Sequence, residues 1–263
     1  IDGEHRLGQP MINGTFISDY GNLDLFILPY FRTRTYSGKK GRFHGSYIID
    51  NDLATYQHED EDKHIDLAAR YSHSIGNLDV GVSYFTGTDR EPIISLSTSG
   101  SSLSPHYIQA NQYLLDFQYI HQAWIFKLEG LHKTGLLIEN YNAGILGYEY
   151  TFSNIKNSGL DLGVLTEYLY DQRDLSQTLL NNHLFMAGRL AFNDQKSTAL
   201  LAGVIYNLNA STFTSLRAEG SRRINESLNW AIESNVVLET QQKELLNTFK
   251  DDDYVKLSLR FYF

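Results

Sequence analysis

Strict alternation of apolar and polar residues through the last ten residues, 254–263, is the feature that most limits what this chain can fold into. Successive side chains of an extended strand point to opposite faces, so this segment has one apolar and one polar face. Such a strand fits either a β-barrel in a membrane or a soluble β-sheet with one buried side. The apolar face carries Val255, Leu257, Leu259, Phe261 and Phe263.

The same alternation recurs along the whole chain, and it recurs in pairs of segments. Residues 65–72 and 78–84 alternate on either side of a short turn at 74–77, which predicts a β-hairpin. Segments of this kind number about thirteen, each of roughly nine to twelve residues, the length at which a tilted strand crosses a bilayer. The chain therefore has enough strands for one large β-sheet.

The connections between these segments are of two kinds. Short turns, such as 21–22, 76–77 and the one at Gln122, alternate with mostly longer segments, of which 33–63 and 87–110 are examples. Outer-membrane barrels have short turns on the periplasmic side and long loops outside, whereas Greek-key sandwiches do not sort their connections in this way. We therefore expect an all-β fold, a transmembrane antiparallel up-and-down β-barrel.

An odd strand count is unusual for such a barrel, because single-chain bacterial barrels have an even number of strands with both termini in the periplasm. By the alternation of turns and loops, the first visible strand runs downward, and an upward strand should precede it. We expect residues 1–263 to form a single outer-membrane barrel domain that lacks its N-terminal strand or strands. The full chain would then have fourteen or more strands.

Composition narrows the classes of function. The chain has no cysteine, which excludes a disulfide framework and thiolate metal sites. No apolar run reaches the roughly eighteen residues of a membrane helix, and a net charge of −9 is unlike the basic footprint of a nucleic-acid-binding protein. The 18 tyrosines and 14 phenylalanines favour strands and can supply the aromatic girdles of a barrel.

The segment 58–64, rich in carboxylates, is the stretch that could bind a divalent cation through hard oxygen ligands. It lacks the spacing and the glycine of an EF-hand loop, so a solvated acidic loop is the favoured interpretation. We expect no metal site and no cofactor.

Residues 31–38, 81–92 and 201–206 carry a resemblance to known sequences. These segments resemble a family of porin-like outer-membrane proteins of Gram-negative bacteria, whose members are functionally uncharacterised. The C-terminal alternation resembles the closing strand of an outer-membrane barrel, in which the terminal Phe and its alternating partners form the signal read by the barrel assembly machinery. The resemblance implies a bacterial outer-membrane location, contact with outer-membrane lipid and lipopolysaccharide, and assembly either as a monomer or as a homo-oligomer. It implies no substrate.

The polar side of the alternation carries charges of both signs, interleaved on neighbouring strands. Inside a wide barrel such charges would line a water-filled pore and filter solutes by charge. The alternative is that they pair across strands and stiffen the wall. Because the positive and negative charges are nearly equal in number, we expect weak charge selectivity. The candidate pore-lining residues are Arg70, Lys127, Glu129, Glu149, Glu167, Arg189, Arg217, Glu219, Glu233, Lys256 and Arg260.

We expect a channel for passive diffusion of small polar solutes, narrowed by the segments 33–63 or 87–110 folding inward. A conduit for hydrophobic molecules or lipids is a second possibility, an outer-membrane hydrolase a third, and a sealed barrel for adhesion or support a fourth. The second possibility has support from apolar residues on the inward side, namely Phe26, Leu28, Leu165, Leu169, Leu201 and Ile205.

Signals for catalysis are weak, and we expect the protein not to be an enzyme. His73, His121 and His132 alternate onto the lipid side, where a histidine near an interface is more often part of a girdle than a base. The histidines and acids near the external rim match no nucleophile motif such as Gly-x-Ser-x-Gly. No catalytic residue is therefore predicted.

Overall fold

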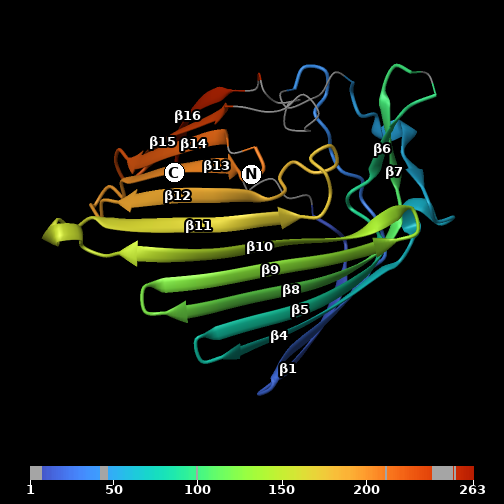
Figure 1. Ribbon diagram of the computed structural model, residues 1–263, viewed down its shortest axis with the longest axis horizontal. Helices are drawn as coiled ribbons and strands as arrows, with labels where there is room; N and C mark the ends of the chain where they lie inside the picture. The colour runs from blue at the N-terminus through green and yellow to red at the C-terminus, as the bar shows by residue number, and fades with distance from the viewer. Residues whose placement is uncertain (1–7, 42–46, 99, 211, 239–250, 252) are drawn as a thin grey trace. The chain divides into compact units, whose positions relative to one another are not determined.

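Residues 8–41, 47–98, 100–210, 212–238, 251 and 253–263 are described by a computed structural model. In this part of the chain, thirteen strands form one antiparallel sheet whose hydrogen-bonded order follows the chain (Figure 1). The strands are β1 (Ile12–Ser18), β2 (Gly21–Leu28), β4 (Asp66–Ile75), β5 (Leu78–Thr88), β8 (Gln109–His121), β9 (Trp124–Gly135), β10 (Ile138–Phe152), β11 (Asp161–Asp171), β12 (His183–Ala191), β13 (Ala199–Asn207), β14 (Thr212–Arg223), β15 (Leu228–Val237) and β16 (Tyr254–Phe261).

The prediction of an all-β, antiparallel up-and-down fold is confirmed, and so is the expected number of strands. β1 and β16 stand at the two ends of the strand order. Among the described residues, no helix is both long and apolar enough to cross a membrane.

The β4–β5 hairpin shows how the sequence sets the register. Gly76 has a positive φ of 62°, as the tight turn between Ile75 and Leu78 requires. Tyr71 then lies opposite Val82, and Arg70 lies opposite Ser83. Because a shift of one residue would exchange the two faces, this register keeps apolar pairs on one side of the sheet and polar pairs on the other.

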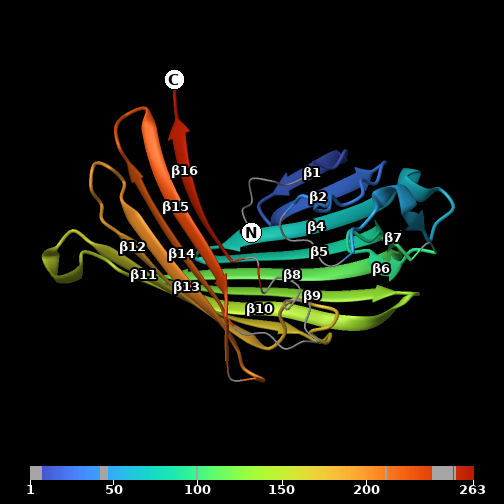
Figure 2. The ribbon, with the colours of Figure 1, turned by 90° about the horizontal axis from the view of Figure 1, so that it is seen from above.

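The chain divides into two compact units, which we describe separately. The first comprises Ile1–Asp116 and Gly130–Asn142. Its strands β1, β2, β4 and β5 lie side by side (Figure 2). It also holds a small second sheet, in the order β3-β7-β6, and two short 3-10 helices. These elements are β3 (Thr55–Tyr56), β6 (Ile93–Leu96), β7 (Leu103–Tyr107), η2 (Asn51–Leu53) and η3 (Glu61–Lys63).

The small sheet corrects the expectation that residues 87–110 form a loop. β5 continues to Thr88, β6 and β7 form an antiparallel pair, and β8 begins at Gln109. The Ser- and Gly-rich stretch is only the turn between β6 and β7, since the apolar residues on either side pair with one another. The extended segment expected near 45–49 lies partly outside the described residues, and Ile49 forms an isolated bridge with Leu103.

The core of the first unit lies among its long connections. The Phe31 and Tyr107 rings pack edge to face with centroids 4.7 Å apart, and Tyr56 stacks on Tyr107 at 5.5 Å. Phe31, Tyr107 and Ile108 are completely or almost completely buried. Burial raises the pKa of Tyr56 to about 12, and the carboxylate of Asp62 adds to the shift. The connections on this side of the first unit are therefore packed structure.

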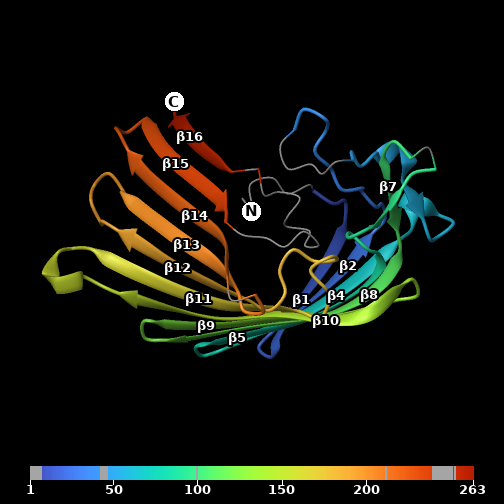
Figure 3. The same cartoon turned by 45° about the horizontal axis from the view of Figure 1, so that its top comes forward.

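The second unit comprises Phe117–Glu129 and Ala143–Phe263. Its strands β11 to β16 follow one another in the sheet (Figure 3). A β-bulge shifts the β13–β14 register between Ile205 and Tyr206. The turn before β11 contains a short 3-10 helix, η4 (Ile155–Asn157).

Candidate functional site: the charged face of the sheet

In each unit one face of the large sheet carries the charged side chains, and we call it the polar face. The opposite face is the apolar face. Residues paired across neighbouring strands lie on the same face of the sheet. Asp24 pairs with Arg70 in this way, and Glu233 pairs with Lys256. All eleven candidate pore-lining residues fall on the polar face by this alternation.

In the middle of the first unit's polar face, Arg70 on β4 forms a bidentate ion pair with Asp116 on β8. The two guanidinium nitrogens lie 2.7 Å from the two carboxylate oxygens, and Nη1 also donates to Ser83 at 3.1 Å. The pair lies directly over Gly81, where an added Cβ would come within 2.1 Å of Asp116. Glycine at position 81 therefore makes room for the ion pair.

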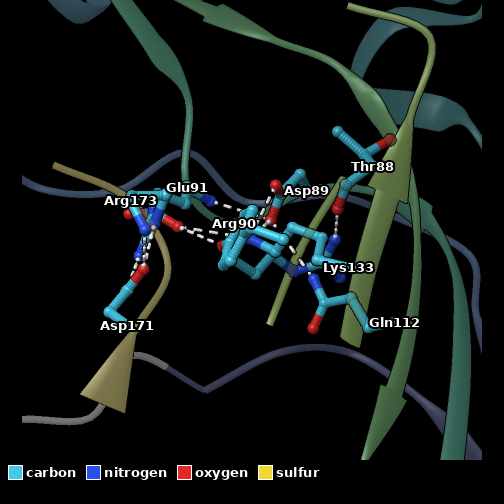
Figure 4. Close-up of polar contacts among 9 residues, drawn as sticks. Thr88, Asp89, Arg90, Glu91, Gln112, Lys133, Asp171 and Arg173 are labelled. Atoms are coloured by element: carbon cyan, nitrogen blue, oxygen red, sulfur yellow. Dashed lines mark hydrogen bonds and ion pairs between the residues drawn. The ribbon is translucent and has the colours of Figure 1, made fainter. Parts of the chain in front are cut away.

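A second, buried cluster ties the segment after β5 to β9. Lys133 Nζ donates to both carboxylate oxygens of Asp89, at 2.9 and 3.2 Å, and to Glu91 at 3.2 Å. Gln112 Nε2 donates to Asp89 at 3.3 Å, and the Tyr141 hydroxyl donates to Glu91 at 3.3 Å. Figure 4 shows Lys133 and Gln112 pointing toward Asp89. The Lys133 and Asp89 side chains are only 5% and 4% exposed.

Asp66, at the start of β4, holds a third cluster in the first unit. Its carboxylate accepts the Thr88 backbone N–H at 2.8 Å and lies 2.7 Å from Arg90 Nη1 and 2.9 Å from His64 Nδ1. The Arg90 guanidinium also lies over the Phe31 ring, 4.7 Å from its centroid. The residues that enter and leave the long connections are thus fixed to the polar face by charge.

In the second unit the ion pairs on this face are about as exposed as Arg70 and Asp116, and far more exposed than Lys133 and Asp89. Lys127 Nζ lies 3.6 Å from Glu149 Oε2. Glu167 lies over Gly147, where an added Cβ would come within 2.8 Å of its Cγ. Glu129 is exposed and forms no ion pair among the described residues. Three carboxylates and one ammonium give this stretch of the polar face a net negative charge.

A further group joins β14, β15 and β16. Arg217 Nε lies 2.6 Å from Glu219 Oε1, and Arg217 Nη2 lies 3.3 Å from Glu233 Oε1. Lys256 Nζ lies 3.9 Å from Glu233 Oε2, and the Tyr254 hydroxyl donates to Glu233. The Arg217, Glu233 and Lys256 side chains are 33%, 23% and 57% exposed. Opposite charges therefore compensate one another here while they stay in contact with solvent.

The structure thus brings most of the candidate residues into ion pairs. Arg189 is exposed and has no ion-pair partner in the described ranges, and Arg260 lies across from Asn229 on β15. The sequence analysis omitted Asp116, Asp89 and Asp66 from the site. Alternation placed Asp116 and Lys133 on the polar side, but the partners of Lys133 lie 42 and 44 residues away.

On the apolar face, large side chains point away from the protein. Those of the expected assembly signal that lie on β16 are 66% to 71% exposed, and Phe263 lies beyond the end of the strand. Their role as a signal stays a prediction. His132, also on this face, donates a hydrogen bond from Nδ1 to Asn142 Oδ1 at 2.8 Å and lies near the Tyr113 ring.

The acidic segment 58–64 is also described. His58 Nδ1 lies 3.6 Å from Asp60 Oδ2, while His64 turns to Asp66. Within the ranges that the structure describes, no group of three or more His, Asp or Glu side chains is arranged to hold a metal ion.

Comparison with known proteins gives few relatives. No protein-family model matches the chain, and no curated protein matches it. A solved structure that it does match is the outer membrane phospholipase dimer of Salmonella typhi with bound calcium, at 11% sequence identity and a TM-score of 0.34. The match covers 76% of this chain and 79% of the phospholipase chain. At this score the similarity assigns neither a fold nor an activity.

Proposed function

We propose that the protein is a membrane-spanning β-barrel of the bacterial outer membrane that lets small polar solutes diffuse through a charged lumen. The observation that carries the proposal is the contrast between the two faces of the sheet. The apolar face exposes large side chains on strand after strand, while the polar face holds charges in contact with solvent.

The apolar face suits lipid. Apolar surface exposed to water is unfavourable by a free energy of about 25 cal/mol per Å². Contact with the hydrocarbon of a bilayer removes this unfavourable free energy. An up-and-down antiparallel sheet also satisfies its backbone hydrogen bonds between strands, as a bilayer demands. These arguments support a lipid-facing wall, with outer-membrane lipid and lipopolysaccharide as its surroundings.

Aromatic clusters support two interfacial girdles. Near the turns of the second unit, the Trp124 ring lies 4.5 Å from Tyr150 and 5.8 Å from Phe126. Near the long connections of the first unit, Tyr84 and Tyr113 lie 5.1 Å apart. Tyr and Trp gather at both edges of the apolar band in outer-membrane barrels.

The buried cluster around Lys133 fixes the segment that narrows the proposed channel. Because Asp89 and Glu91 are bound on the polar face, the segment that carries them stands on the solute's side of the wall. We expect this segment to limit the size of the solutes that pass.

A liposome-swelling assay tests the proposal. The full-length protein is inserted into phospholipid vesicles, and its fold is verified by heat-dependent migration in gels. Swelling in arabinose that is faster than swelling in raffinose is the expected result. A folded barrel that gives no swelling in either sugar would refute diffusion of small polar solutes.

A second candidate, a conduit for hydrophobic molecules, is favoured by one observation in the second unit. Leu165, Phe185, Leu201 and Ile205 share the polar face, and Phe185 lies over Gly203, where an added Cβ would come within 2.9 Å of the ring. A conduit for hydrophobic molecules should bind a fluorescent fatty acid saturably, and Phe185→Ala should weaken that binding. If the protein is a pore for polar solutes only, no saturable binding of the fatty acid is expected.

We further propose that the protein is not an enzyme. His132 donates to an amide oxygen, and His64 contacts the Asp66 carboxylate, which also pairs with Arg90. Phospholipid hydrolysis by the purified protein should stay at the level of a His132→Ala variant. Calcium-dependent release of fatty acid that this variant lacks would contradict the proposal.

A further inference from the structure

A small cavity of about 150 Å³ opens in the second unit, where β14 and β15 approach the turns. The residues that line it include three arginines, Arg222, Arg223 and Arg260, together with Ser197 and Asn229. A space of this volume holds a phosphate group with a small organic remainder. The cavity is therefore of the right size for a small anion.

The strand register explains how two of the arginines meet. Arg223 on β14 lies opposite Asn229 on β15, and Asn229 lies opposite Arg260 on β16. Neighbouring strands are about 4.8 Å apart, so the two arginine backbones stand about 10 Å apart on one face with an amide between them. Long side chains reach over that distance, and both guanidinium groups can contact one anion.

The charge balance at this end of the strands differs from that in their middle. In the middle, Arg217 and Lys256 face Glu219 and Glu233. At the cavity, the Arg223 guanidinium forms no ion pair within the described part of the chain.

Two turns at this end of the strands carry a carboxylate each, Asp194 and Glu226. The Asp194 carboxylate accepts hydrogen bonds from the Thr198 N–H and hydroxyl, at 2.7 and 2.8 Å. These hydrogen bonds, and to a smaller extent the charge of Arg222, lower the pKa of Asp194. Glu226 lies exposed in the turn between β14 and β15. No Asp or Glu is among the described residues that line the cavity, so its charged lining residues are all cationic.

We propose that this cavity is a binding site for a phosphate group, in which Arg223 and Arg260 act as charged donors and Ser197, Ser221 and Asn229 complete the set of hydrogen-bond donors. Guanidinium groups bind phosphate oxygens through paired, charge-assisted hydrogen bonds. The inference rests on the proposed function in one respect, because a free solute reaches this site through the lumen. It then names the solute class, namely small phosphate-bearing molecules.

Trp230 is among the lining residues and follows Asn229 on β15, with its side chain on the opposite face of the sheet, and its fluorescence provides the readout. In a Trp124→Phe background it is the only tryptophan left, because the chain has two. We expect its fluorescence in lipid-free detergent to change saturably with sodium phosphate at constant ionic strength, and to stay unchanged with sodium chloride. The double variant R223Q/R260Q should weaken phosphate binding about tenfold or more.

Arg189→Gln is the matched control, since Arg189 is exposed on the same face but does not line the cavity. An unchanged affinity in R223Q/R260Q, or an equal loss in Arg189→Gln, would overturn the site. The same titration in phospholipid nanodiscs separates two sources of the phosphate group. A response that persists there indicates a free solute, and a response that lipid removes indicates a lipid headgroup in the same site.

Planar-bilayer recording separates this inference from the proposed function. If the channel conducts and phosphate lowers its chloride current in the wild type but not in R223Q/R260Q, both stand. If the channel conducts and phosphate has the same effect on both proteins, the site fails and the channel remains. If neither protein conducts, the channel fails, and the fluorescence titration alone decides the site.

Discussion

Two lysines of the polar face, Lys133 in the first unit and Lys127 in the second, form ion pairs that differ in how deeply they are buried. In the first unit, the Lys133–Asp89 pair is almost completely buried. In the second unit, Arg217, Glu233 and Lys256 are paired and remain in contact with solvent. The burial of Lys133 follows from one connection, because Asp89 and Glu91, which come after β5, contact its ammonium group. Cations on the polar face therefore hold a buried carboxylate at Lys133 and remain in contact with solvent at Lys127, as Arg70 does within the first unit.

The largest difference between the units should appear when one lysine of each is removed. Lys133→Ala leaves Asp89 buried without its counter-charge and should lower the free energy of unfolding by about 3–5 kcal/mol. Lys127→Ala, in the exposed pair with Glu149, should cost less than about 1 kcal/mol. Denaturant titration of both variants in vesicles measures the two values.

A double variant sharpens this result. Replacing both partners, as in K133M/D89L, should recover most of the lost stability, since no charge is then left buried. Equal costs for Lys133→Ala and Lys127→Ala would contradict the contrast between the units.

A smaller difference should appear at two glycines. Gly81→Ala in the first unit places a Cβ against the Arg70–Asp116 pair and should cost about 1–3 kcal/mol. Gly163→Ala in the second unit meets its nearest atoms only at 3.9 Å and should be nearly neutral. The same denaturant titration compares them, and a neutral Gly81→Ala would show that the ion pair is free to move.

Exposed charges in the second unit should affect ion selectivity more than stability. The variant E219Q/E233Q leaves Arg217 and Lys256 uncompensated, so chloride permeability relative to potassium should rise, by less than about tenfold. Arg217→Gln should shift the reversal potential in the opposite direction. Both shifts should shrink at 1 M salt because of screening. Identical reversal potentials in the three proteins would remove these residues from the solute's path.

The smallest effect should be the titration of an exposed turn in the second unit. The backbone N–H of Thr198 and then its hydroxyl donate to Asp194 and hold the pKa of that carboxyl below its ordinary value of 3.8. The folded pKa is the lower one, so this stabilisation is present above pH 3.8 and is lost as the pH falls through the folded pKa. Asp194→Asn should therefore have a flatter stability profile below pH 4. Parallel profiles for variant and wild type would refute the assignment.

Alternation was sufficient to predict the strands of the large sheet and its polar face, because period two is a local property of the sequence, but it missed the short strands β3, β6 and β7. The partner of Arg70 was harder to predict, since Asp116 comes from a strand that is not its neighbour along the chain. Predicting the Lys133 cluster requires the path of the connection after β5, and no local sequence pattern specifies that path. The arginine cavity depends on register across β14, β15 and β16, and the sequence analysis identified only Arg260 among its arginines.

Single-channel recording of the full-length protein in a planar bilayer tests the central claim, that the polar face lines a water-filled path. We expect steady conductance steps with weak selectivity in the wild type, and a changed reversal potential in E219Q/E233Q. A barrel that is folded, as judged by heat-dependent migration, and yet shows no conductance would contradict the claim.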